Sequence, residues 1–158
     1  MFGDDRMPVT ITDERPDSAA ARELIGELES QLNSFYPPES QHGYSVEKLL
    51  SEGVAFFVVR RDGLPAGCGG IKLFGSEYGE IKRMYVRPAH RRLGFGRLLV
   101  EHLTNYARQQ RVACLRLETG IHQCEAIGLY ERMGFERIGP FGDYHDDPLS
   151  CFFEKQIG

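Results

Sequence analysis

Two glycines and three arginines lie together in the stretch HRRLGFGRLLVEHL, residues 90–103, directly ahead of an apolar run with helical spacing. The first turn of a helix leaves backbone N–H groups without partners, and the helix dipole adds partial positive charge there. Glycine lets a ligand approach the backbone closely. Arg91, Arg92 and Arg97 can donate charge-assisted hydrogen bonds to oxygen atoms. The arrangement predicts an anion site, most simply for a phosphate or pyrophosphate.

The same stretch has a simpler interpretation, in which the glycines only make a tight turn and the arginines form a solvated face. It lacks the third glycine of a Rossmann fingerprint and the Gly-Lys-Ser/Thr of a P-loop, so neither common nucleotide motif is met. Its position favours binding nevertheless, because a strand predicted to end at Val86 turns through RPAHRR into a helix beginning at LGFG. The common nucleotide motifs lie at the same kind of strand-to-helix junction.

Composition restricts the partners. The 158 residues, 41% hydrophobic and 27% charged, suit one globular domain with one core, expected over residues 8–158. With 19 basic and 23 acidic residues the formal net charge is −4, so general attraction to nucleic acid or an acidic membrane is not expected. The longest apolar run, VAFFVV, is about a third of a membrane span, and the short acidic start does not resemble a targeting segment. We expect a soluble, cytoplasmic protein.

The four cysteines are widely separated and form no CxxC pair, so neither a zinc ribbon nor a thioredoxin-type dithiol is indicated. No metal site is expected, and reduced thiols fit best. Two of the cysteines lie in apolar, strand-like stretches that are typical of buried thiols. Cys124 differs because it would begin a helix, whose N-terminus can lower a thiol pKa. It is a minor candidate nucleophile.

Apolar periodicity and turn residues predict a mixed α/β domain with a βαβ unit around the glycine motif. A hairpin is expected at Asp62-Gly63, since these residues tolerate the positive φ of tight turns. Ser45 is expected to cap a short helix that extends through Leu50. Strands are predicted at residues 9–12, 54–60, 66–74, 79–86, 112–119 and 151–157, and longer helices at 18–34, 94–110 and 124–134.

The stretch VRPAHRRLGFGRLL resembles the acetyl-CoA pyrophosphate loop of the GNAT superfamily of N-acetyltransferases, whose pattern is Arg or Gln, two residues, Gly, one residue, then Gly or Ala. Arg91, Gly94 and Gly96 occupy those positions, and the resemblance continues in EIKRMYV upstream and LYERMGF downstream. It implies the GNAT fold, an α/β fold with a central mixed, mostly antiparallel twisted sheet flanked by helices and strands that splay at the acetyl-CoA site. It also implies acetyl transfer from acetyl-CoA, a co-substrate, to an amine.

The resemblance implies a role for each matched position. The backbone of Met84 and Val86, with Tyr85 between them, would bind the pantetheine arm and the acetyl carbonyl. Tyr130 matches a tyrosine that protonates the departing CoA thiolate; its alternative is an aromatic ring packed in the core. Gln123 stands where many members carry asparagine, and it offers the same amide on a longer stem. The pyrophosphate would be held by the amides of Leu93, Gly94, Phe95, Gly96 and Arg97.

Glu80 lies four residues before Met84, where the histone-acetylating branch of the superfamily carries its general base. A strand glutamate beside an apolar cleft can have a raised pKa and accept a proton, directly or through water. The alternative is a structural pair with Lys82 or Arg83. Glu118, at the end of the neighbouring predicted strand, and bulk water are the other candidate bases.

The stretches PPESQHG, LETG and PFGDYHDDPLS resemble a bacterial GNAT subgroup often labelled indoleacetate-type acetyltransferases. Two of them fall in the regions that border the acceptor side of this fold, where acidic groups would favour a cationic amine. Solvated loop charges are the alternative interpretation. The candidate acceptor-side residues are His42, Tyr144, His145, Asp146 and Asp147.

Together these features predict an enzyme that moves an acetyl group directly from acetyl-CoA to a primary amine of a small molecule or peptide. A base would free the amine of its proton, an acid would protonate the leaving thiolate, and a backbone N–H of the Met84 strand would hold the oxyanion. Retention of both Glu80 and Tyr130 argues against a non-catalytic acyl-CoA-binding or regulatory module. Ping-pong transfer through Cys124 is a second alternative, and a homodimer is left open.

Overall fold

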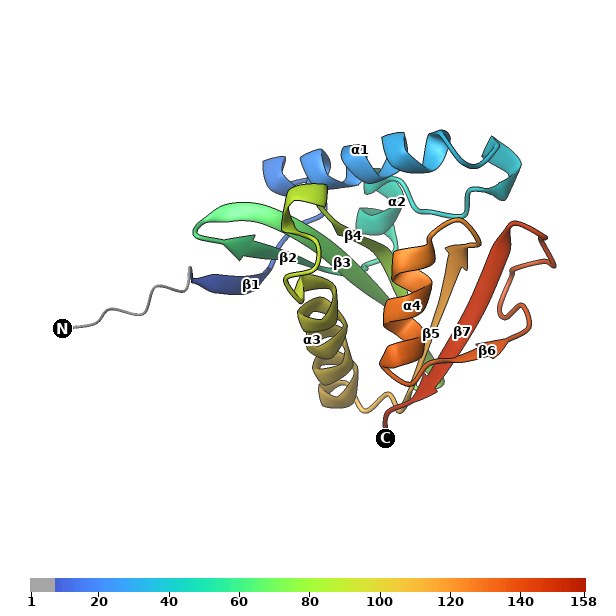
Figure 1. Ribbon diagram of the computed structural model, residues 1–158. Helices are drawn as coiled ribbons and strands as arrows, with labels where there is room; N and C mark the ends of the chain where they lie inside the picture. Colours follow the sequence, from blue (N-terminus) through green and yellow to red (C-terminus); the bar gives the residue numbers. More distant parts are fainter. Residues whose placement is uncertain (1–7) are drawn as a thin grey trace.

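The computed structural model describes residues 8–158, so the first seven residues lie outside the description. Seven strands form one sheet in the order β1-β2-β3-β4-β5-β7-β6 (Figure 1), and every pairing is antiparallel except β4 with β5. This confirms the predicted mixed, mostly antiparallel sheet. The strands are β1 Val9–Asp13, β2 Ala55–Arg61, β3 Leu64–Phe74, β4 Tyr78–Val86, β5 Cys114–Gly120, β6 Glu136–Ile138 and β7 Ser150–Gln156. The helices are α1 Ala19–Asn33, α2 Val46–Ser51, α3 Phe95–Gln109 and α4 Cys124–Arg132, with single turns at Pro38–Ser40 and Pro88–His90.

Different helices cover the two faces of the sheet (Figure 1). On β2, Phe56 and Val58 pack with residues of α1 and α2, whereas Phe57 packs with residues of α3 and α4. Successive side chains of a strand point to opposite faces. The run VAFFVV is therefore apolar throughout because its strand is buried on both sides.

Capping and turn residues set most boundaries of the helices and strands where the sequence analysis predicted them. Ser18 caps α1 by accepting from the N–H of Ala21, and Ser45 caps α2 in the same way. Asp62 and Gly63 form the hairpin turn with φ of +52° and +77°. The sequence analysis missed β6, which pairs with β7 at the edge of the sheet. Three residues are too few to display a periodic pattern.

Strands β4 and β5 pair along only three residues and then separate. Their register ends at Ile81 opposite Leu117. Beyond this point β4 pairs only with β3, and β5 only with β7. The edges of residues 82–86 and 118–120 therefore turn toward a gap, which confirms the predicted splay.

A bulge redirects β4 where the splay begins. Arg83 and Met84 together oppose the single residue Gly69, and the φ of Arg83 is +57°. A non-glycine residue in this region of backbone space costs on the order of 1–3 kcal/mol, and such strain is typical of functional sites. A Cβ on Gly69 would lie 2.5 Å from the sulfur of Met84, so the glycine leaves room for the methionine side chain.

Candidate active site

A groove of about 610 Å³ lies between the end of β4 and the N-terminal ends of α3 and α4. It gathers residues from three of the stretches that the sequence analysis matched to a cofactor site. Leu93 is not among its lining residues, and the side chain of Leu93 is exposed. The predicted cofactor residues that do line the groove are Met84, Tyr85, Val86, Arg91, Arg92, Gly94, Phe95, Gly96, Arg97, Gln123 and Tyr130.

The N-terminal ends of α3 and α4 at the groove have partial positive charge and backbone N–H groups that no side chain of the described residues caps. Gly94 precedes α3 as its N-cap with φ +84°, a conformation that favours glycine. Whereas serines cap α1 and α2, no side chain in residues 8–158 caps α3 or α4. The first backbone N–H groups of α3 and α4 are therefore available to an anion, and both helix dipoles favour one.

The three arginines of the glycine loop differ in their contacts. Arg91 donates from Nε to the last carbonyl of β4 at 3.0 Å and from Nη2 to Gln31 of α1 at 3.1 Å, so it braces the loop. Arg97 forms an exposed pair with Glu101 at 3.1 Å, an interaction that contributes little energy. Arg92 is exposed with φ +63°. Arg92 and Arg97 can thus turn to a ligand, and the phosphate contacts of all three arginines stay predictions.

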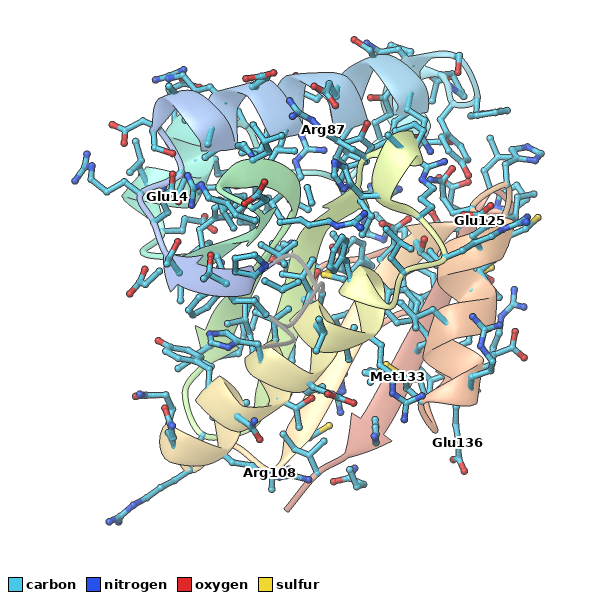
Figure 2. All side chains as sticks on the ribbon, turned by 60° about the vertical axis from the view of Figure 1, so that its left-hand side comes forward. Glu14, Arg87, Arg108, Glu125, Met133 and Glu136 are labelled. Carbon is cyan, nitrogen blue, oxygen red and sulfur yellow. The ribbon has the colours of Figure 1, made fainter. Side chains whose placement is uncertain are left out.

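Arg87, labelled in Figure 2, ties the end of β4 to α1. Its guanidinium contacts the carboxylates of Glu23 and Glu27 and donates from Nη1 to the carbonyl of Pro65 at 3.0 Å. The sequence analysis assigned this residue no role. It fixes the segment from which the glycine loop departs.

A second pocket, of about 120 Å³, adjoins the groove and extends between the splayed strands toward the loops at residues 35–45 and 139–149. Glu80 and Glu118, the two candidate bases, both line it. A group held at the boundary is accessible from both cavities. The residues that line both cavities are Leu28, Met84, Gln123, Ala126 and Tyr130.

The ring of Tyr130 is packed in the core, as one of its two predicted interpretations stated, and its role as an acid stays a prediction. The ring is in the core, with its centroid 5.5 Å from that of Phe135 and 6.4 Å from that of Phe153. Burial raises the pKa of the phenol, and the negative charge of Glu118 raises that pKa further. The hydroxyl stays protonated at neutral pH and is available as a donor.

Glu80 is paired, as one of the sequence-based alternatives foresaw. Its Oε2 accepts from Lys82 Nζ at 2.9 Å and from Tyr144 Oη at 2.5 Å, and the residue is only 3% exposed. Burial lowers the pKa of Lys82, opposed by the charge of Glu80. Arg83 pairs instead with Glu29 at 2.9 Å. The Glu80 carboxylate is therefore already engaged by two donors.

Glu118 has a different environment. Its Oε2 accepts one neutral hydrogen bond, from the hydroxyl of Ser150 at 2.7 Å. Burial raises the pKa of Glu118, and the Ser150 hydrogen bond and the nearby His42 oppose the rise. A carboxylate with a raised pKa is a stronger proton acceptor than an ordinary one.

The two stretches that the sequence analysis placed at the acceptor side contact each other. His42 Nε2 lies 3.3 Å from Asp147 Oδ2, and the His42 ring packs edge-on against Tyr144, with the ring centroids 5.6 Å apart. His42 and Tyr144 line the smaller pocket. His145 and Asp146 are exposed and line neither cavity.

Tyr36 is a site residue that the sequence analysis missed. Its buried Oη accepts from the N–H of His122 at 2.9 Å and donates to Gln123 Oε1 at 3.4 Å. This contact orients the Gln123 amide at the boundary of the two cavities. Tyr36 follows the end of α1 in a proline-rich loop, where no periodic pattern marks a buried side chain.

Other candidate chemistry is limited in residues 8–158. Cys124 is exposed at the start of α4 and lines the groove. No three His, Cys, Asp or Glu side chains in this part of the chain are grouped to hold a metal ion. None of its helices has the length and apolarity needed to span a bilayer.

Known proteins are similar to this chain in sequence and in architecture. A family model described as the acetyltransferase (GNAT) family matches residues 23–135. IAA acetyltransferase of Azospirillum brasilense is 43% identical over 94% of this chain and 98% of its own length. A Klebsiella pneumoniae structure assigned as an acyl-CoA N-acyltransferase is 37% identical, with a TM-score of 0.81 over 95% of this chain and 98% of that one. PaiA N-acetyltransferase of Thermoplasma acidophilum, solved with coenzyme A, shares the fold at 19% identity, with a TM-score of 0.76 over 95% of this chain and 99% of that one.

Proposed function

The chain belongs to the acetyltransferase (GNAT) family and is an acyltransferase, and we propose that it transfers acetyl directly from acetyl-CoA to a primary amine of a small molecule or peptide. The observation that carries the proposal is the boundary between the two cavities. A groove with two uncapped helix ends meets a pocket with two carboxylates, and Tyr130 lines both. Donor and acceptor can thus be bound at once, as direct transfer requires.

Acetyl-CoA fits the groove by its chemistry. The pyrophosphate would bind the backbone N–H groups of residues 94–97 together with Arg92 and Arg97. The pantetheine arm would bind the edge of β4 that β5 leaves unpaired, beside the Gln123 amide. The thioester would then lie at Tyr130, where the groove meets the pocket. The coenzyme A bound to a relative of the same fold supports this choice of co-substrate.

The reaction follows from the groups at the boundary. The neutral amine attacks the thioester carbon, and a backbone N–H of β4 near the Arg83 bulge holds the developing oxyanion. The C–S bond breaks, and Tyr130 protonates the departing thiolate. The amine gives its proton to a carboxylate. We assign that role to Glu118, because its pKa is raised and, within residues 8–158, a neutral hydroxyl is its only hydrogen-bond donor. We keep Glu80 as the alternative base.

Two isosteric variants distinguish the candidate bases. A protonated carboxyl cannot accept a proton, so kcat/KM of the parent enzyme should fall as the pH drops through the raised pKa of Glu118. Glu118→Gln should lower kcat/KM about 10²-fold and remove this acidic limb. Glu80→Gln should keep the limb but move it to lower pH, because the negative charge of Glu80 helps to raise the pKa of Glu118. Loss of the limb in Glu80→Gln alone would assign the base to Glu80, and a limb present in both variants would assign it to water.

The proposed reaction is tested by release of the CoA thiol in the presence of polyamines, amino acids, aminoglycosides and peptides. Acceptor-dependent release is the expected result. Tight acetyl-CoA binding without release for any acceptor would instead favour a non-catalytic acyl-CoA-binding module. An enzyme acetylated at Cys124 in the absence of acceptor would favour ping-pong transfer.

A further inference from the structure

The acceptor would bind in the smaller pocket, of about 120 Å³, which is called the acceptor pocket below. Every basic side chain that lines it within residues 8–158 already has an acidic partner. Each contact lies within 3.3 Å. An anionic group on an acceptor would therefore have to displace a protein carboxylate to find a cation. The pairs are Lys82 with Glu80, Arg83 with Glu29, and His42 with Asp147.

Lys82 is surrounded on all sides. Its Nζ lies 2.9 Å from Glu80 Oε2, 3.4 Å from Tyr144 Oη and 3.8 Å from the centroid of the Tyr44 ring. The side chain is 6% exposed. An ammonium group has three N–H donors. The carboxylate, the phenol and the ring face occupy them, so Lys82 has no free direction toward a ligand.

Arg83 is held as firmly. Its Nε donates to the carbonyl of Tyr44 at 2.8 Å, and its Nη2 donates to Glu29 at 2.9 Å. The backbone of Gly43 covers the guanidinium, because a Cβ there would lie 2.5 Å from the guanidinium carbon. The charge of the Arg83 guanidinium is thus already balanced by Glu29, and its Nε and Nη2 are engaged.

Not every acidic side chain of the pocket has a basic partner in the described part of the chain. Glu118 has one hydrogen bond, from the neutral Ser150 hydroxyl, and no basic side chain of the described residues lies within ion-pair distance of it. Within residues 8–158 the pocket therefore offers one carboxylate without an ion-pair partner, and each of its basic side chains has one. Its remaining walls include the aliphatic side chains of Leu28, Leu32 and Ile81.

We infer that the acceptor is a primary amine on a carbon chain that carries no carboxylate beside the amine, such as an alkylamine, an arylalkylamine or a polyamine end. This inference rests on the proposed acetyl transfer. The carboxylate of an α-amino acid is separated from the amine by a single carbon, so it must enter the 120 Å³ pocket with the amine. It would then face Glu80 and Glu118 without a cation, and burial of an unpaired charge is strongly unfavourable.

Matched acceptors that differ only at the α-carbon test this inference. Tyramine with tyrosine and phenethylamine with phenylalanine separate the amine from the amino acid, and phenylalaninamide keeps the added bulk without the charge. The amines should exceed the amino acids in kcat/KM by about 10²-fold or more, and the amide should regain most of the difference. Amino acids turned over as well as the amines would overturn the inference and leave the proposed function intact. No CoA release with these compounds or with the wider amine panel would contradict the proposed function, and the inference with it.

A variant that removes the acidic partner of Lys82 should weaken the preference for amines over amino acids. Glu80→Gln leaves Lys82 without its acid, so the ratio of kcat/KM for amine over amino acid should fall about 10-fold. The ratio is independent of any general loss of rate. Glu14→Gln, which breaks an equivalent pair with Arg60 at 2.8 Å outside the pocket, should leave the ratio unchanged.

Circular dichroism and a melting curve establish that the Glu80→Gln variant is folded. If it is not, Glu29→Gln tests the same account through Arg83, because the Glu29 side chain is 45% exposed and its loss is tolerated more easily. An unchanged ratio in a folded variant would contradict the role of the paired cations.

Discussion

Gly96→Glu is expected to abolish measurable acetyl-CoA binding while the fold is retained. Gly96 lies in the first turn of α3, where the unpaired N–H groups and the helix dipole favour an anion. A glutamate there adds bulk and negative charge at the proposed pyrophosphate position. The new Cβ meets only the end of the Leu129 side chain, at 2.9 Å, which can shift. Calorimetric titration should give an affinity reduced by at least about 10²-fold.

Two control variants separate charge from size at this position. Gly96→Ala adds only the Cβ and should have a small effect, and Gly96→Gln adds the bulk of glutamate without its charge and should be intermediate. Equal losses for Gln and Glu would assign the effect to bulk alone. Unchanged affinity of a natively folded Gly96→Glu variant would rule out the pyrophosphate site at this helix.

Tyr130→Phe should reduce kcat about 10²-fold and leave acetyl-CoA affinity almost unchanged. The phenylalanine ring keeps the contacts with Phe135 and Phe153, so the melting temperature should change little. Because burial raises the pKa of Tyr130, the parent phenol stays protonated through the usual range of enzyme assays. The loss should therefore be nearly constant across that range of pH.

The leaving group provides the control for this variant. An acyl donor whose thiol is acidic enough to depart without protonation should lose less rate in Tyr130→Phe than acetyl-CoA does. If the variant turns over acetyl-CoA as fast as the parent enzyme, Tyr130 is a packing residue and the thiolate takes its proton from water. Equal losses with both donors would likewise contradict a general-acid role.

The features that the sequence determined by itself depend on residues close together in the chain. Serine caps act on N–H groups three residues away, and the Asp62-Gly63 turn needs only its own backbone freedom. The spacing of Gly94 and Gly96 ahead of an apolar helix likewise predicted the position of the proposed anion site. Such short-range rules predicted the mixed α/β domain and all but one of its strands. The arrangement of the sheet and the segments that form the groove were implied by the resemblance to the GNAT superfamily.

Only the tertiary structure distinguishes the environments of the two candidate bases. Glu80 is engaged by Tyr144 across 64 residues of chain, and Glu118 is met by a hydroxyl 32 residues away. Tyr36 reaches Gln123 from 87 residues away. The pKa of a carboxylate depends on burial and on the charges around it in space, and neither quantity is encoded by neighbouring residues. The sequence therefore named both glutamates, and only the folded chain distinguished them.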